Sequence, residues 1–204
     1  MKRVGIIVVF ASLAVLTTAT AADAYHHGHK RHRHHKKHTH KTGLGKLLAP
    51  ASACPGQSDA SLSAARQEAA MRCMINYARR KSGQADLADT SKLDSSAGDK
   101  ANDIIRCDQF SHSACGRDFT FWFDQLGYID PGGNGCWRAG ENIAWGTGSL
   151  STVGSIADAW IHSPDHLANM LSDSFEQFGV GFEVGPLDGF DGAHVWVTHF
   201  GSHC

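Results

Sequence analysis

This 204-residue chain lacks several signatures of common metal, redox and membrane proteins. None of its six cysteines forms a C-x-x-C pair, which argues against a zinc ribbon or a thioredoxin-type redox motif. No H-E-x-x-H motif is present, so there is no compact signature of a metal centre. The apolar run at residues 4–16 is too short to cross a bilayer as a helix. No Ser or Cys has a recognisable relay for nucleophilic catalysis, and no internal repeat is visible.

The short apolar run belongs to a segment typical of a signal peptide. Lys2 and Arg3 precede it, and small residues follow it up to the A-x-A sequence Ala22-Asp23-Ala24. A basic start, an apolar middle and a small-residue end favour cleavage over a retained anchor helix. We therefore expect residues 1–24 to be a signal peptide, the mature chain to start near Tyr25, and the protein to be secreted, extracellular or periplasmic.

Secretion makes the six cysteines candidates for disulfides, because export places them in an oxidising compartment. Three bridges are expected, and six cysteines allow fifteen pairings. The sequence does not choose among them, and we favour Cys54–Cys73, Cys115–Cys136 and Cys107–Cys204.

Charge divides the mature chain into two parts. Residues 25–42 contain eight His and six Lys or Arg, and nothing there can form a core, so we expect residues 25–53 to be a disordered tail and linker. Imidazoles of such a tail can bind transition metals, and its positive charge suits an anionic cell-wall polymer or membrane surface.

The remaining body, residues 54–204, is acidic. It has 10 Lys or Arg against 19 Asp or Glu, a formal balance of −9. This argues against nucleic-acid binding by the folded part. About 150 residues are enough for one hydrophobic core and not for two.

Periodicity predicts helices first and strands last within this body. The expected helices cover residues 61–80 with a cap at Ser61, 92–107, 118–128, 151–163 and 164–171; the expected strands cover 178–185 and 193–201. This order indicates an α+β fold with a closing antiparallel hairpin. We expect Trp145, Trp160, Trp196 and Phe200 in the core, and His194 and His199 at a sheet edge or partly exposed.

Three polar residues are candidates for a functional site. His112 follows the second predicted helix, Glu141 lies on a loop after Cys136, and His166 lies on the first turn of the helix that Ser163-Pro164 begins. Two imidazoles and one carboxylate can form a metal centre with open positions or an acid–base pair. A cap or surface role is the alternative for each His, and anchoring of backbone amides in a loop is the alternative for Glu141. Asn142 is expected to satisfy buried backbone groups.

Three motifs carry a resemblance to a known family: "FSH" at 110–112, "GENIAWG" at 140–146 and "AWIHSPDHLANML" at 159–171. In this order they resemble the bacterial branch of the CAP superfamily, named for cysteine-rich secretory proteins, antigen 5 and pathogenesis-related 1 proteins. The resemblance covers residues 61–201. It implies a three-layer αβα sandwich with a central antiparallel sheet, stapled by disulfides, and a surface cleft.

The resemblance also implies a site in that cleft. Many relatives have two His and two acidic residues there, and can hold a divalent metal. By position His112, Glu141 and His166 match three of the four, and they are our predicted ligands for Zn²⁺ or another divalent metal. The second acid has no counterpart, because Ser163 stands near its place. In the last strand Val197-Thr198 replaces the Thr-Gln of many relatives.

These departures favour binding over catalysis. We expect a secreted CAP-domain protein that binds a divalent metal and an extracellular ligand or partner, without strong catalysis. A metal-assisted hydrolase of peptide or cell-wall material, with Glu141 as general base, is the alternative. A third hypothesis is a rigid adhesion module that the basic tail targets to the cell wall.

Overall fold

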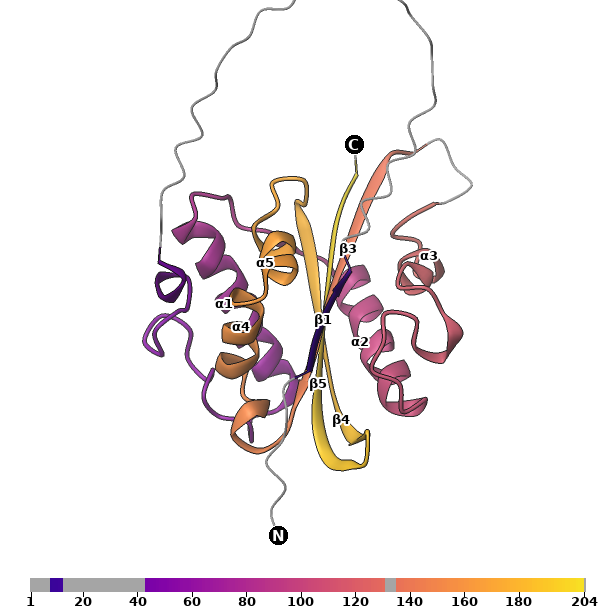
Figure 1. Ribbon diagram of the computed structural model, residues 1–204. Coiled ribbons are helices and arrows are strands. Elements are labelled where there is room, and N and C mark those ends of the chain that lie inside the picture. The colour runs from indigo at the N-terminus through magenta and orange to yellow at the C-terminus, as the bar shows by residue number, and fades with distance from the viewer. Residues whose placement is uncertain (1–7, 13–42, 131–134, 204) are drawn as a thin grey trace, which may run out of the picture.

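The computed structural model describes residues 8–12, 43–130 and 135–203. Its centre is a five-stranded sheet of order β1-β3-β5-β4-β2. Helices α1, α4 and α5 cover one face of the sheet, and α2 and α3 cover the other (Figure 1). The expected α+β sandwich is therefore confirmed.

The five predicted helices all form. Their bounds are α1 Ala64–Lys81, α2 Ser91–Arg106, α3 Phe121–Gln125, α4 Val153–Ile161 and α5 Pro164–Leu171, with 3-10 turns at Leu44–Lys46, Ala114–Gly116 and Gly148–Ser151. The N-cap position of the first helix is Ser63 and not Ser61, and the Ser63 side chain makes no capping hydrogen bond. Thr90 caps α2 by accepting a hydrogen bond from the Leu93 amide. Among the described residues, no helix combines the length and apolar character needed to cross a membrane.

Two of the five strands were expected. The strands are β1 Val8–Ser12, β2 Ala88–Asp89, β3 Trp137–Gly146, β4 Gln177–Leu187 and β5 Phe190–His203. Strands β4 and β5 form the predicted antiparallel hairpin, joined at Asp188-Gly189. The sheet is mixed and not wholly antiparallel, because the two-residue strand β2 pairs parallel to β4.

Strand β3 replaces the loop on which we placed Glu141. It pairs antiparallel with β5 over its whole length. Nine of its ten residues are buried, so its sequence shows no alternation of apolar and polar residues. Alternation is the usual signal for a strand, and its absence explains why this one was missed.

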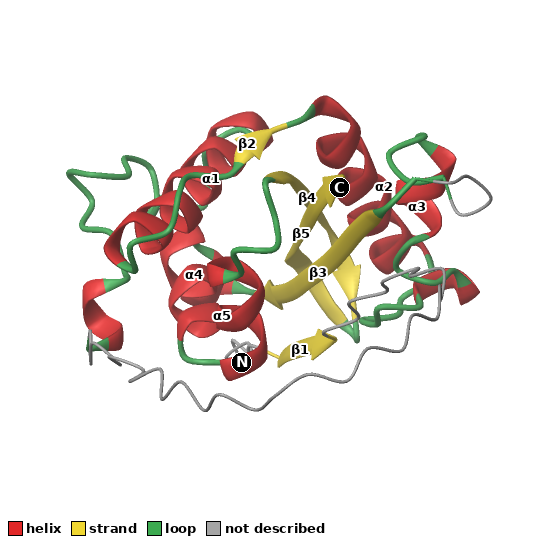
Figure 2. Cartoon of the chain, turned by 90° about the horizontal axis from the view of Figure 1, so that it is seen from above, coloured by secondary structure: helices red, strands yellow, loops and turns green. Residues whose placement is uncertain are grey.

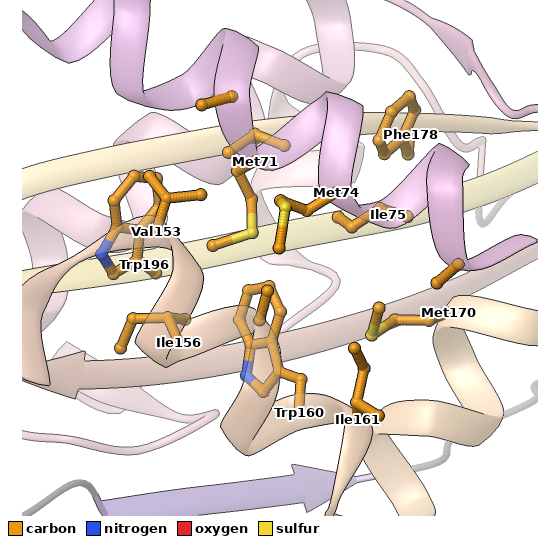
Figure 3. Close-up of a cluster of buried hydrophobic side chains, with 14 of the residues drawn as sticks. Met71, Met74, Ile75, Val153, Ile156, Trp160, Ile161, Met170, Phe178 and Trp196 are labelled. Carbon is orange, nitrogen blue, oxygen red and sulfur yellow. The ribbon is translucent and has the colours of Figure 1, made fainter. Parts of the chain in front are cut away.

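The larger core lies between the sheet and helices α1, α4 and α5, where Met71, Trp160 and Trp196 meet (Figure 3). All four expected core residues are buried: Trp145, Trp160, Trp196 and Phe200. Leu47 and Ala49 also belong to this core. The packed body therefore begins before Cys54, and residues 43–53 are not the disordered linker that we expected.

On the opposite face, α2 packs directly onto the backbone of β4. Two glycines permit the close approach. A methyl group at Gly181 would lie 2.2 Å from the carbonyl carbon of Ala97, and one at Gly179 would lie 2.1 Å from the Asp94 nitrogen. Because α2 sits so close to the sheet, its side chains reach the polar groups of β3 and β5.

Two disulfides join described residues: Cys54–Cys73, as expected, and Cys107–Cys115. The second bridge shows that the favoured pairings Cys115–Cys136 and Cys107–Cys204 are wrong. Cys136 is also disulfide-bonded. Cys107 and Cys115 close a short loop directly after α2, and this loop carries His112.

Candidate functional site

Glu141 lies in the middle of the sheet and is fully buried. It is the register partner of His199 on β5, and both residues have an exposed fraction of 0%. Side chains of cross-strand partners point to the same face. His199 Nε2 lies 2.8 Å from Glu141 Oε2. The expectation that His199 is partly exposed was wrong, because β5 is a central strand and not an edge.

His112 contacts the other oxygen of the same carboxylate. Its Nδ1 lies 2.5 Å from Glu141 Oε1, and its side chain is 17% exposed. The Lys100 ammonium on α2 donates a 2.6 Å hydrogen bond to the His112 carbonyl oxygen. The Cys107–Cys115 bridge and this lysine together hold the His112 loop against the sheet.

The hydrogen-bond partners determine where the protons lie. An ionised carboxylate only accepts hydrogen bonds. His112 therefore donates from Nδ1, and His199 donates from Nε2. His199 Nδ1 is left as an acceptor 2.7 Å from Ser96 Oγ, so the Ser96 hydroxyl donates to it. The result is a buried chain that runs from Ser96 through His199 and Glu141 to His112.

The pKa shifts agree with these proton positions. Burial alone would raise the pKa of Glu141, but hydrogen bonds from His112 and His199, with the charge of Lys100, lower it to about 2. Burial lowers the pKa of His199 and so favours the neutral imidazole, although Glu141 acts in the opposite direction. Burial also lowers the pKa of Lys100, while Glu141 and Asp103 act in the other direction.

The remaining nitrogen of His112, Nε2, is the ring atom of this cluster that lacks a hydrogen-bond partner among the described residues. Since Nδ1 donates to Glu141, Nε2 is the ring nitrogen left to accept a hydrogen bond. Nε2 is buried and has no hydrogen-bond partner within the described part of the chain. An oriented imidazole with a free Nε2 can accept a hydrogen bond, take up a proton or bind a cation.

His166 lies on the opposite face of β3 from this cluster. It is buried on α5, and its Nδ1 lies 2.8 Å from Ser163 Oγ. Its carbonyl oxygen accepts a 3.1 Å hydrogen bond from Asn142, whose side chain points away from that of its neighbour Glu141. Asn142 satisfies a buried backbone group, as expected. The structure thus brings His112 and Glu141 together and places His166 across the strand.

This arrangement does not fit a three-ligand metal centre. Both oxygens of Glu141 are engaged by imidazoles, and His166 approaches β3 from the other side. No group of three or more His, Cys, Asp or Glu side chains in residues 8–12, 43–130 and 135–203 is arranged to hold a metal ion. Metal binding by His112, Glu141 and His166 stays a prediction, and no chemical step is derived through it.

Sequence reasoning missed three members of the cluster: Ser96, Lys100 and His199. Ser96 and Lys100 are four residues apart in a helix and therefore share a face. Both are buried. Two polar residues at this spacing within an apolar helix face indicate buried polar side chains, and this pattern could have identified them. For His199, the signal was the uncharged run "VWVTHF", which is typical of a strand buried on both faces.

One protein-family model matches this chain. The model of the cysteine-rich secretory protein family (CAP) matches residues 73–200. No curated protein matches the chain.

Two solved structures share the fold. One is an extracellular SCP-domain protein from Bacillus anthracis, with a TM-score of 0.51 and 19% identity, covering 68% of this chain and 43% of that one. The other is an outer surface protein from Borrelia burgdorferi, with a TM-score of 0.56 and 17% identity, covering 70% of this chain and 97% of that one. This chain therefore spans less than half the length of the Bacillus protein.

Proposed function

Because the chain belongs to the cysteine-rich secretory protein family, we propose that it is an extracellular binding protein in which His112 contacts the ligand and Glu141 orients His112. The family match, the extracellular bacterial structure and the disulfides support an oxidising location outside the cytoplasm. Binding is the function that the contacts of Glu141 favour over hydrolysis.

The engagement of both Glu141 oxygens carries this proposal. A general base needs an oxygen within hydrogen-bond reach of the water or substrate that it deprotonates. Glu141 is fully buried, and its two oxygens accept hydrogen bonds from His112 and His199. A carboxylate in this position fixes the tautomer and direction of an imidazole, as the acid does in catalytic triads and behind metal-bound histidines.

His112 Nε2 is the atom that a ligand would contact. Leaving a buried acceptor without a partner costs about 1–3 kcal/mol, which a hydrogen-bond donor or a cation on the ligand would recover. Lys100 and the Cys107–Cys115 bridge hold the surrounding loop, so the loop loses little conformational freedom when a ligand binds.

Zinc is a suitable probe of this atom, and it also tests the predicted metal site. Residues 25–42 are removed first, because their eight His would mask a single site. Zinc titration followed by NMR should shift the His112 ring resonances, and His112→Ala should abolish the response. His162→Ala is the matched control, because this histidine side chain is 55% exposed and outside the cluster. Unchanged zinc affinity in His112→Ala would contradict the proposal.

The hydrolase alternative makes a different prediction. Metal-dependent turnover of peptides or cell-wall fragments that disappears in Glu141→Gln would favour it and overturn the binding assignment. Ser96 is an unsuitable nucleophile, because it is fully buried and its hydroxyl bonds to His199. We expect no turnover across broad peptide and cell-wall libraries.

The opposite charges of tail and body favour a targeting role for the tail. Residues 25–42 carry six Lys or Arg and no acid, whereas the body from Cys54 onward has a formal charge of −9, from 10 basic and 19 acidic residues. We propose that the tail contacts anionic cell-wall polymer. Retention on isolated anionic cell wall should fall steeply with added salt and be lost without residues 25–42. Retention that depends neither on salt nor on residues 25–42 would rule out a targeting role for the tail.

A further inference from the structure

The outer edge of β3, the side away from β5, is paired with a segment from the extreme N-terminal part of the chain. Strand β1 runs antiparallel to β3, with Val8 opposite Trp145 and Ser12 opposite Glu141. Figure 2 shows β1 beside β3, and helix α5 also packs against β1. The part of β3 that pairs with β1 includes Glu141 and Asn142.

Strand β1 comes from the segment that the sequence predicts to be a signal peptide. Cleavage after Ala24 would cut the connection between residues 8–12 and the folded body. Strand β3 would then be an edge, with a row of backbone N–H and C=O groups that β5 cannot pair. Such an edge is a template for an extended chain, because each unpaired group gains a hydrogen bond when a strand is added.

The two faces of β3 carry the residues that matter for binding. His112 contacts Glu141 on the α2 face, and His166 contacts Asn142 on the α5 face. The open edge lies between these faces. A peptide added there would run along the stretch of backbone from which both groups are positioned.

We propose that the outer edge of β3 in the secreted protein binds an extended peptide as an added antiparallel strand. The preferred segment is short, apolar and rich in β-branched or aromatic residues, as is the Val-Val-Phe-Ala-Ser of β1. This inference deepens the proposed binding function and names its ligand class. It does not depend on the chemistry of His112, because the contacts that define it are backbone hydrogen bonds.

Alternate N-methylation of a peptide tests the backbone pairing. The probe is acetyl-Val-Val-Phe-Ala-Ser with two lysines added for solubility, titrated into the secreted protein after its N-terminus has been determined. In an antiparallel edge pair, alternate amides point toward the neighbouring strand and the others point away. One probe is methylated at the positions of residues 9 and 11, and its matched control at those of 10 and 12.

Strand addition predicts opposite results for these two probes. One should bind within about twofold of the parent peptide, and the other should lose at least about tenfold in affinity, because its ladder hydrogen bonds are blocked. Amide shifts in NMR spectra should centre on residues 141–145. A variant that retains the leader, with Ala22 and Ala24 replaced by leucine, should not bind the probe, because β1 already occupies the edge.

Several results would overturn the inference. These are equal loss from both methylated probes, shifts centred away from β3, a secreted protein that retains residues 8–12, or pairing of two protein copies through this edge in light scattering. His112→Ala separates this test from the previous one. Unchanged zinc affinity in His112→Ala with the methylation pattern intact overturns the His112 proposal and leaves strand addition standing. Loss of the zinc response in His112→Ala without a methylation pattern overturns strand addition and leaves the His112 proposal.

Discussion

Replacement of Glu141 by glutamine is the sharpest test of the buried cluster. Glutamine has nearly the same shape, but it offers one acceptor oxygen and a donor NH₂ where glutamate has two acceptors. His112 and His199 both donate to this side chain. One of the two imidazoles must therefore lose its acceptor or change tautomer. We expect the variant to fold with reduced stability and with an altered tautomer at one histidine.

The expected loss of stability follows from the pKa of Glu141. The carboxyl has a folded-state pKa of about 2, against an ordinary value of 4.5. Lowering the pKa from 4.5 to about 2 corresponds to about 3 kcal/mol of stability at neutral pH. An unsatisfied imidazole N–H costs about 1–3 kcal/mol by an independent route. Together the two routes give a free energy of unfolding lower by about 1–3 kcal/mol.

Denaturant unfolding across pH measures this effect. Because the folded pKa is depressed, the carboxylate stabilises the native state above pH 4.5, and this contribution is lost as the pH falls from about 4.5 toward 2. The gap between the two proteins should narrow over that window, since glutamine does not titrate. Glu176→Gln is the control, because Glu176 is exposed. A gap that is independent of pH, or no larger than that of the control, would refute the reasoning.

Two further predictions concern the helix that supports the cluster. The Lys100 ammonium donates a hydrogen bond to the His112 carbonyl, and its charge lowers the pKa of Glu141, so Lys100→Met removes both effects. We expect the free energy of unfolding to fall by about 2–4 kcal/mol and the pKa of Glu141, followed by ¹³C NMR, to rise. Lys92→Met is the control, because Lys92 is exposed. Unfolding midpoints should also differ between alanine variants at two glycines. Gly181→Ala should destabilise by more than about 2 kcal/mol, because the methyl group meets the α2 backbone, whereas Gly98→Ala, with open space around it, should stabilise by about 0.5–1 kcal/mol. Equal effects at the two positions would contradict the packing of α2 on β4.

Local patterns predicted the helices and the final hairpin because their signals lie within each segment. The helical periodicity of residues 61–80 and the Ser163-Pro164 start needed no knowledge of the rest of the chain. Strand β3 was missed because it is buried on both faces, so its alternation disappears. The spacing of Cys107 and Cys115 was likewise compatible with several pairings until the turn after α2 brought them together.

The sequence by itself determined the family, the α+β class and the charge division between tail and body, and it singled out Glu141 and Asn142. Only the tertiary structure decided which groups meet them. The register of β3 on β5 places His199 opposite Glu141, and strand alternation directs Asn142 to the face of His166. Both depend on contacts between residues far apart in the chain, and a shift of one residue in strand pairing would exchange the two faces. For that reason the expected cluster of His112, Glu141 and His166 became two polar networks on opposite sides of one strand.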